Sequence, residues 1–68
     1  MPYVKVQLVS GRTPEQKRRI AADVTDSLVR HAGAHAEHCF VVFEDVAADD
    51  WVVGGITVAE RMRARGES

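Results

Sequence analysis

The chain has little cysteine and no long apolar run, and each scarcity excludes a class of protein. Its 68 residues include one cysteine, so no disulfide can form within the chain. No stretch approaches the ~20 apolar residues of a membrane span, and no charged segment followed by an apolar one opens the chain. We therefore expect a cytoplasmic protein. Cys39 lies inside an apolar strand, so we expect it to be a buried structural thiol.

The chain also lacks an excess of charge of either sign. Nine lysine and arginine residues are interspersed with ten aspartate and glutamate residues, giving a net charge of −1. Because this balance creates no sustained field, we expect neither nucleic acid nor a membrane as a partner. The only basic concentration, at residues 61–65, is too short to indicate nucleic-acid binding and is typical of a solvated C-terminus.

Residues that bind metals are few and poorly placed. His31, His35 and His38 have near-helical spacing, but Gly33 interrupts the face, and no carboxylate or cysteine set completes a site. We therefore expect no metal and no cofactor.

What the chain does have is a high apolar content for its size, with 46% hydrophobic residues. A domain this short buries a small fraction of its surface. Without disulfides or a metal, such chains commonly gain the missing burial by self-association. The sequence therefore predicts a single domain, residues 1–68, that forms a homo-oligomer.

Three segments carry clear local signals. Residues 2–9 alternate, with Val4, Val6 and Leu8 on one face, as in a half-buried strand. Thr13 is placed as an N-cap before Pro14, and Gly33 as a helix stop, so we expect a helix between them. Apolar residues then recur at helical spacing: Ile20, Ala21, Val24, Leu28 and Ala32.

A second strand is expected at residues 38–44, where five successive apolar residues predict burial on both faces. Strand, helix and strand make one β-α-β unit of an α/β (α+β) fold, with parallel strands. Residues 51–55 are expected to form a short extended segment or hairpin, and residues 58–65 a short helix or tail.

The second residue, Pro2, carries the first chemical signal. If Met1 is removed, Pro2 presents a secondary amine at the start of the first strand. An α-amino group titrates at about 7.7 to 8.0, and burial beside cations disfavours its protonated form. Pro2 is therefore a candidate general acid and base that needs no side chain.

Three motifs then occur in order: Pro2-Tyr3-Val4, Ser10-Gly11-Arg12 followed by Glu15-Gln16-Lys17, and Trp51 before Gly54-Gly55. In this order, on a β-α-β chain of this length, they resemble the 4-oxalocrotonate tautomerase family over nearly the whole sequence.

This resemblance implies that Pro2 shuttles a proton, that Arg12 binds a substrate carboxylate and that Trp51 forms an apolar wall. It also implies a homohexamer whose active sites draw on neighbouring subunits. The expected activity is that of a cofactor-independent tautomerase or isomerase acting on a small enol, 2-keto acid or unsaturated carbonyl compound.

The chain departs from the family pattern at Phe40, which stands where well-studied members carry a second arginine. Losing one such donor typically costs about 3 to 4 kcal/mol of transition-state stabilisation. Either another cation serves, with His38, Arg61 or Arg63 as candidates, or the substrate has an apolar group facing Phe40. The second option needs fewer assumptions.

A second departure is Val52, where many members have glycine. Together with Phe40, this residue leaves an alternative function open: a non-catalytic or repurposed protein that binds small ligands or assembles on the tautomerase scaffold.

Overall fold

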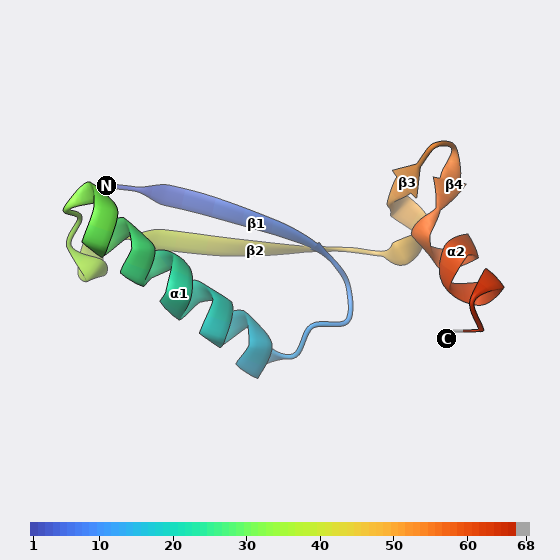
Figure 1. The fold of residues 1–68 in the computed structure, drawn as a ribbon, viewed down its shortest axis with the longest axis horizontal. Coiled ribbons are helices and arrows are strands. Elements are labelled where there is room, and N and C mark those ends of the chain that lie inside the picture. Colours follow the sequence, from blue (N-terminus) through green and yellow to red (C-terminus); the bar gives the residue numbers. More distant parts are fainter. Residues whose placement is uncertain (67–68) are drawn as a thin grey trace.

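A parallel pair of strands joined by one long helix forms the body of the molecule (Figure 1). The computed structural model describes residues 1–66. Strands β1 (Tyr3–Val9) and β2 (Phe40–Val46) pair in parallel, with Tyr3 opposite Phe40 and Val9 opposite Val46. Helix α1 (Pro14–Ala32) connects them. The predicted β-α-β unit with parallel strands is confirmed.

Both ends of α1 are fixed by the residues that the sequence indicated. The hydroxyl of Thr13 accepts the Gln16 backbone N–H at 3.1 Å, and the Gln16 side chain accepts the Thr13 N–H at 2.8 Å. These two bonds satisfy amides that lack partners within the helix. At the other end Gly33 takes a left-handed conformation, φ 68°, and its N–H bonds to the carbonyl of Leu28.

Only one face of the sheet is covered. On the covered face the half-buried residues of β1 are Val4, Val6 and Leu8, and β2 contributes Val41 and Phe43 to the same pattern. The opposite face leaves three large side chains exposed: Tyr3 at 61%, Phe40 at 45% and Val42 at 41%. The helix covers one face of the second strand as expected, and in the single chain the other face, which was expected to need a partner subunit, is exposed.

The second strand also begins two residues later than predicted. A short 3-10 helix, η1 (Ala36–His38), occupies the expected start, held by the N–H of His38 on the carbonyl of His35 at 2.9 Å. Cys39 lies between η1 and β2, half-buried, with Sγ 3.4 Å from the His35 carbonyl oxygen. The placement of Cys39 as a buried thiol within the strand is thus corrected.

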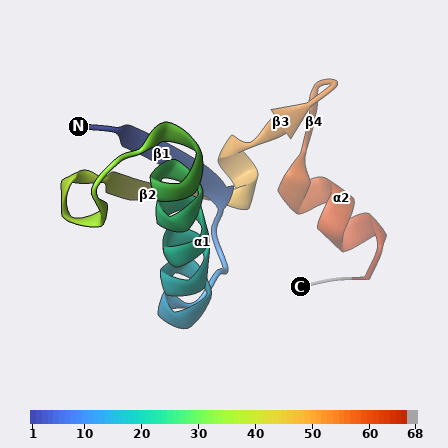
Figure 2. The same ribbon diagram turned by 60° about the vertical axis from the view of Figure 1, so that its left-hand side comes forward.

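The remaining elements form an arm that projects from the body (Figures 1 and 2). After the 3-10 helix η2 (Ala48–Asp50), strands β3 (Val52–Val53) and β4 (Ile56–Thr57) make an antiparallel hairpin that leads into helix α2 (Val58–Ala64). Gly54 and Gly55 turn the hairpin with φ of 60° and 81°, a conformation that favours glycine. The Arg61 guanidinium donates to the Val53 carbonyl at 3.2 Å, which ties α2 to the hairpin.

The chain folded alone has no core, because none of residues 1–66 is fully buried. Its Cα radius of gyration is 15.4 Å, against about 11 Å for a compact chain of this length. Its accessible surface is 5021 Å², against about 4,200 Å² for a compact monomer of this mass. Further burial therefore has to come from another molecule. Within residues 1–66, no helix is both long and apolar enough to cross a bilayer.

Candidate active site

Pro2 lies at the amino end of β1 and is half-buried, whereas Met1 before it is 84% exposed. The Phe40 backbone N–H donates to the Pro2 carbonyl oxygen at 2.9 Å. This bond extends the ladder between β1 and β2 by one step and holds Pro2 beside the start of β2. The backbone around the candidate amine is therefore anchored through its carbonyl, and its nitrogen stays outside the ladder.

Arg12 lies in the loop that leaves the carboxyl end of β1. The Ser10 N–H donates to the Val46 carbonyl at 2.8 Å, which keeps the start of this loop on the sheet. Gly11 then turns with φ 128°, where an L side chain would be strained. The Arg12 side chain is exposed and makes no ion pair with the rest of residues 1–66. It is thus available to bind an anion.

Trp51 lies at the same end of the sheet, directly after η2. It is half-buried, and its carbonyl accepts the Val58 N–H at 2.8 Å. Together with Gln7, Val46 and Asp50 it lines a shallow hollow of about 260 Å³. The sequence did not single out Gln7. The only signal for Gln7 was its place on the polar face of an alternating strand.

The four candidate residues divide into two groups at opposite ends of the sheet. Pro2 and Phe40 share the amino end of the parallel strands, and Arg12 and Trp51 follow their carboxyl ends. At ~3.3 Å per residue, the seven residues of β1 span roughly 23 Å. One chain therefore does not bring the proposed base and the proposed anion binder together, and a shared site needs at least two chains.

The cations that could replace the missing second arginine are differently placed. His38 is two residues before Phe40. The centroids of the His38 and His35 rings are 5.7 Å apart, in an edge-to-face arrangement. Arg61 is instead bound to the hairpin carbonyl of Val53, at the far end of the molecule. Among residues 1–66, no group of three or more histidine, cysteine, aspartate or glutamate residues is arranged to hold a metal ion.

Comparison with known proteins decides the family. Residues 2–61 match the family described as tautomerase enzyme. The chain belongs to the tautomerase family. The predicted membership is confirmed, and with it the assignment as an isomerase with tautomerase activity.

Curated relatives agree over most of their length. A probable tautomerase of Ralstonia nicotianae is 40% identical over 55 residues, covering 81% of this chain and 85% of the relative. The 2-hydroxymuconate tautomerase of Bacillus subtilis is also 40% identical over 55 residues, covering 81% and 89%.

Solved structures share the fold at comparable coverage. The 4-oxalocrotonate tautomerase isozymes of Methylibium petroleiphilum give a TM-score of 0.88 at 30% identity, covering 93% of this chain and 98% of that one. TomN, a 4-oxalocrotonate tautomerase homologue of the tomaymycin biosynthetic pathway, gives 0.85 at 30% identity, covering 93% and 95%.

Proposed function

We propose that this tautomerase uses the Pro2 amine, freed by removal of Met1, as its general acid and base. The observation that carries the proposal is the exposed Met1 beside an anchored, half-buried Pro2. Moving a proton between two positions of an enol or conjugated keto acid requires one group that removes the proton and returns it. A secondary amine that titrates near neutrality can do both.

In this proposal Arg12 binds the substrate carboxylate and Trp51 supplies an apolar wall. A guanidinium holds a carboxylate through two parallel hydrogen bonds and favours negative charge developing on the conjugated system. The absence of an ion pair between Arg12 and the other described residues supports this role. Trp51 is half-buried and lines the hollow of about 260 Å³ at that end of the sheet, which supports its role as a wall.

The site is then composite, with Pro2 of one subunit beside Arg12 of another. The roughly 23 Å length of β1 supports this arrangement, because it separates the two residues within a chain. We propose a homohexamer. A 4-oxalocrotonate tautomerase of Chloroflexus aurantiacus, similar to this chain at 25% identity and a TM-score of 0.83, is a heterohexamer.

The proposed substrate is a small enol or 2-keto acid that carries an apolar group where a dicarboxylate would carry its second carboxylate. Phe40 offers an exposed ring and no hydrogen-bond donor from its side chain. A second arginine at this position would typically contribute two to three decades in rate. No cofactor is needed for the proposed chemistry.

The proposal is tested with processed protein, its mass confirming that Met1 is absent, assayed with phenylenolpyruvate and with 2-hydroxymuconate. We expect Pro2→Ala and Arg12→Ala each to lower kcat/KM at least a hundredfold, and the wild type to prefer phenylenolpyruvate. Arg19→Ala, an exposed arginine bound to Glu15, is the matched control and should retain activity. Equal activity in all four proteins would overturn the assignment of Pro2 and Arg12.

A further inference from the structure

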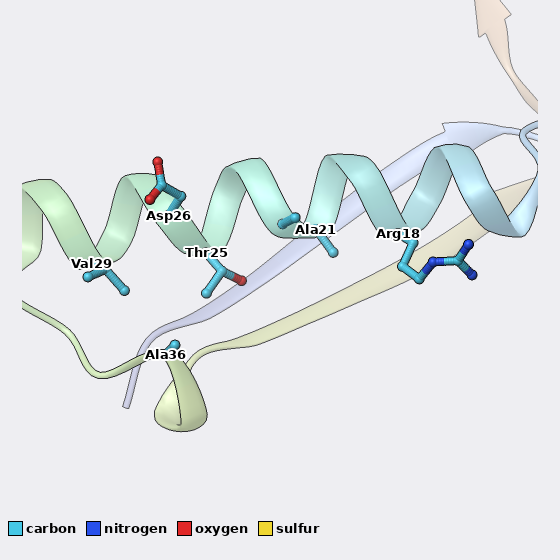
Figure 3. A pocket seen from close by; sticks show the side chains of 7 residues that line it. Arg18, Ala21, Thr25, Asp26, Val29 and Ala36 are labelled. Atoms are coloured by element: carbon cyan, nitrogen blue, oxygen red, sulfur yellow. The ribbon is translucent and has the colours of Figure 1, made fainter.

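The aromatic rings that could select a substrate lie on the sheet and not in the hollow beside the helix. That hollow, of about 570 Å³, follows one flank of α1 (Figure 3). Its lining includes small side chains such as Ala21 and Thr25, but no aromatic ring and none of the candidate site residues. The uncovered face of the sheet instead carries two large rings, Tyr3 at 61% exposure and Phe40 at 45%.

Tyr3 and Phe40 are partners in the parallel ladder between β1 and β2. Neighbouring strands lie about 4.8 Å apart, so these two side chains leave the same face of the sheet side by side. The ladder continues one step further at Pro2, whose carbonyl accepts the Phe40 N–H at 2.9 Å. Tyr3 therefore accompanies Phe40 into the site, whichever subunit supplies the other residues.

The two neighbouring rings do not pack on each other. Aromatic side chains this close can gain energy from ring contact, yet within residues 1–66 the only contact between rings joins His35 and His38. The Tyr3 hydroxyl also makes no hydrogen bond with the rest of the described chain. Both rings thus remain available to a planar group, and the phenol keeps an unused donor beside them.

We propose that Tyr3 is a further specificity-determining residue of this tautomerase. Its ring lies against the far group of the substrate, and its hydroxyl donates a hydrogen bond to an uncharged oxygen at the tip of that group. The inference rests on the proposed function, which places the far end of the substrate at Phe40. The favoured substrate class is then an enol or 2-keto acid whose far group is planar and conjugated and ends in a hydroxyl or carbonyl oxygen.

The chemistry of a phenol favours an uncharged oxygen over a second carboxylate. A phenol offers one hydrogen bond and no charge, whereas a guanidinium offers two parallel bonds and a positive charge. A carboxylate moved from water onto two aromatic rings would keep its charge uncompensated, which is costly. The nearest cation along the same strand face, Lys5, is already paired with Glu44 at 3.3 Å. A neutral oxygen loses less on leaving water, and one hydrogen bond replaces that loss.

Tyr3→Phe tests the hydroxyl apart from the ring. The probes are phenylenolpyruvate and its 4-hydroxyphenyl counterpart, which differ by one oxygen at the tip. The wild type should prefer the hydroxylated probe about fivefold in kcat/KM, the usual worth of one hydrogen bond, and Tyr3→Phe should lose this preference. Tyr3→Leu, which also removes the ring, should lower kcat/KM for both probes. Lys5→Met, two residues along the same face, is the matched control and should keep the preference. A wild type without the preference, or a Tyr3→Phe variant that keeps it, would overturn the role of Tyr3.

Binding measurements separate this inference from the proton-transfer role of Pro2. In a Pro2→Ala background, calorimetric titration with phenylpyruvate and 4-hydroxyphenylpyruvate should show the same preference as a ratio of Kd values. Adding Tyr3→Phe to that background should bring the ratio close to one. Full activity of Pro2→Ala would contradict the proposed base and still leave the role of Tyr3 supported by the ratio. An unchanged Kd ratio after loss of the Tyr3 hydroxyl would instead refute the role of Tyr3 and leave Pro2 in place.

Discussion

The backbone N–H of Phe40 donates to the carbonyl oxygen of Pro2 at 2.9 Å, so the candidate base and the residue that departs from the family pattern share one step of the sheet ladder. Substitution of the Phe40 side chain leaves this backbone bond intact. The two questions raised by the sequence, which group moves the proton and which substrate it acts on, can therefore be tested separately.

Phe40→Arg should change the substrate preference. A guanidinium there would supply a donor to negative charge at the far end of a dicarboxylate, a contribution typically worth two to three decades. We expect kcat/KM for 2-hydroxymuconate to rise about tenfold or more and that for phenylenolpyruvate to fall. The control is Val42→Arg, which lies on the same exposed face of β2, two residues further along the strand. A parallel change for both substrates would show that position 40 does not select between them.

Retention of Met1 should abolish activity while leaving the fold unchanged. With Met1 attached, the Pro2 nitrogen is a tertiary amide and has no basic lone pair. Met1 is 84% exposed, so its presence displaces no packing within the described chain. Loss of activity is distinguished from a change of fold by measuring intact mass, circular dichroism and tautomerase activity on processed and unprocessed preparations. Full activity in a preparation whose mass includes Met1 would remove Pro2 from the mechanism.

Thr13→Ala should destabilise the protein by about 1 kcal/mol, the usual cost of losing an N-cap. The Thr13 hydroxyl accepts the Gln16 N–H at 3.1 Å as one half of the capping box. Thr13→Ser keeps the hydroxyl and serves as the control. Chemical denaturation at fixed protein concentration measures both, since assembly makes the apparent stability depend on concentration. Equal stability of the two variants would show that the cap contributes nothing.

The sequence predicted those parts of the fold that local chemistry determines. The cap at Thr13, the stop at Gly33 and the alternation of β1 each depend on contacts within a few residues, and the structure has all three. The start of β2 was misplaced because an apolar run does not reveal where a 3-10 turn ends; His38 is the last residue of that turn and Cys39 follows it as the cap.

The candidate site was harder to predict, because one chain does not bring its residues together. Pro2 and Arg12 are far apart because they stand at the two ends of one strand, and this separation could be predicted from the sequence.

Through its ion pair with Lys17, Asp45 should position the Arg12 loop. Lys17 Nζ lies 2.8 Å from Asp45 Oδ2, with the lysine side chain 26% exposed, joining the first turn of α1 to the end of β2. Since such pairs are worth up to about 1 kcal/mol, Asp45→Asn should raise KM up to about fivefold with kcat unchanged. Asp45→Glu should restore KM, and Asp23→Asn, an exposed carboxylate on α1, should leave it unaltered. A fall in kcat with KM unchanged would instead assign the pair a role in the chemical step.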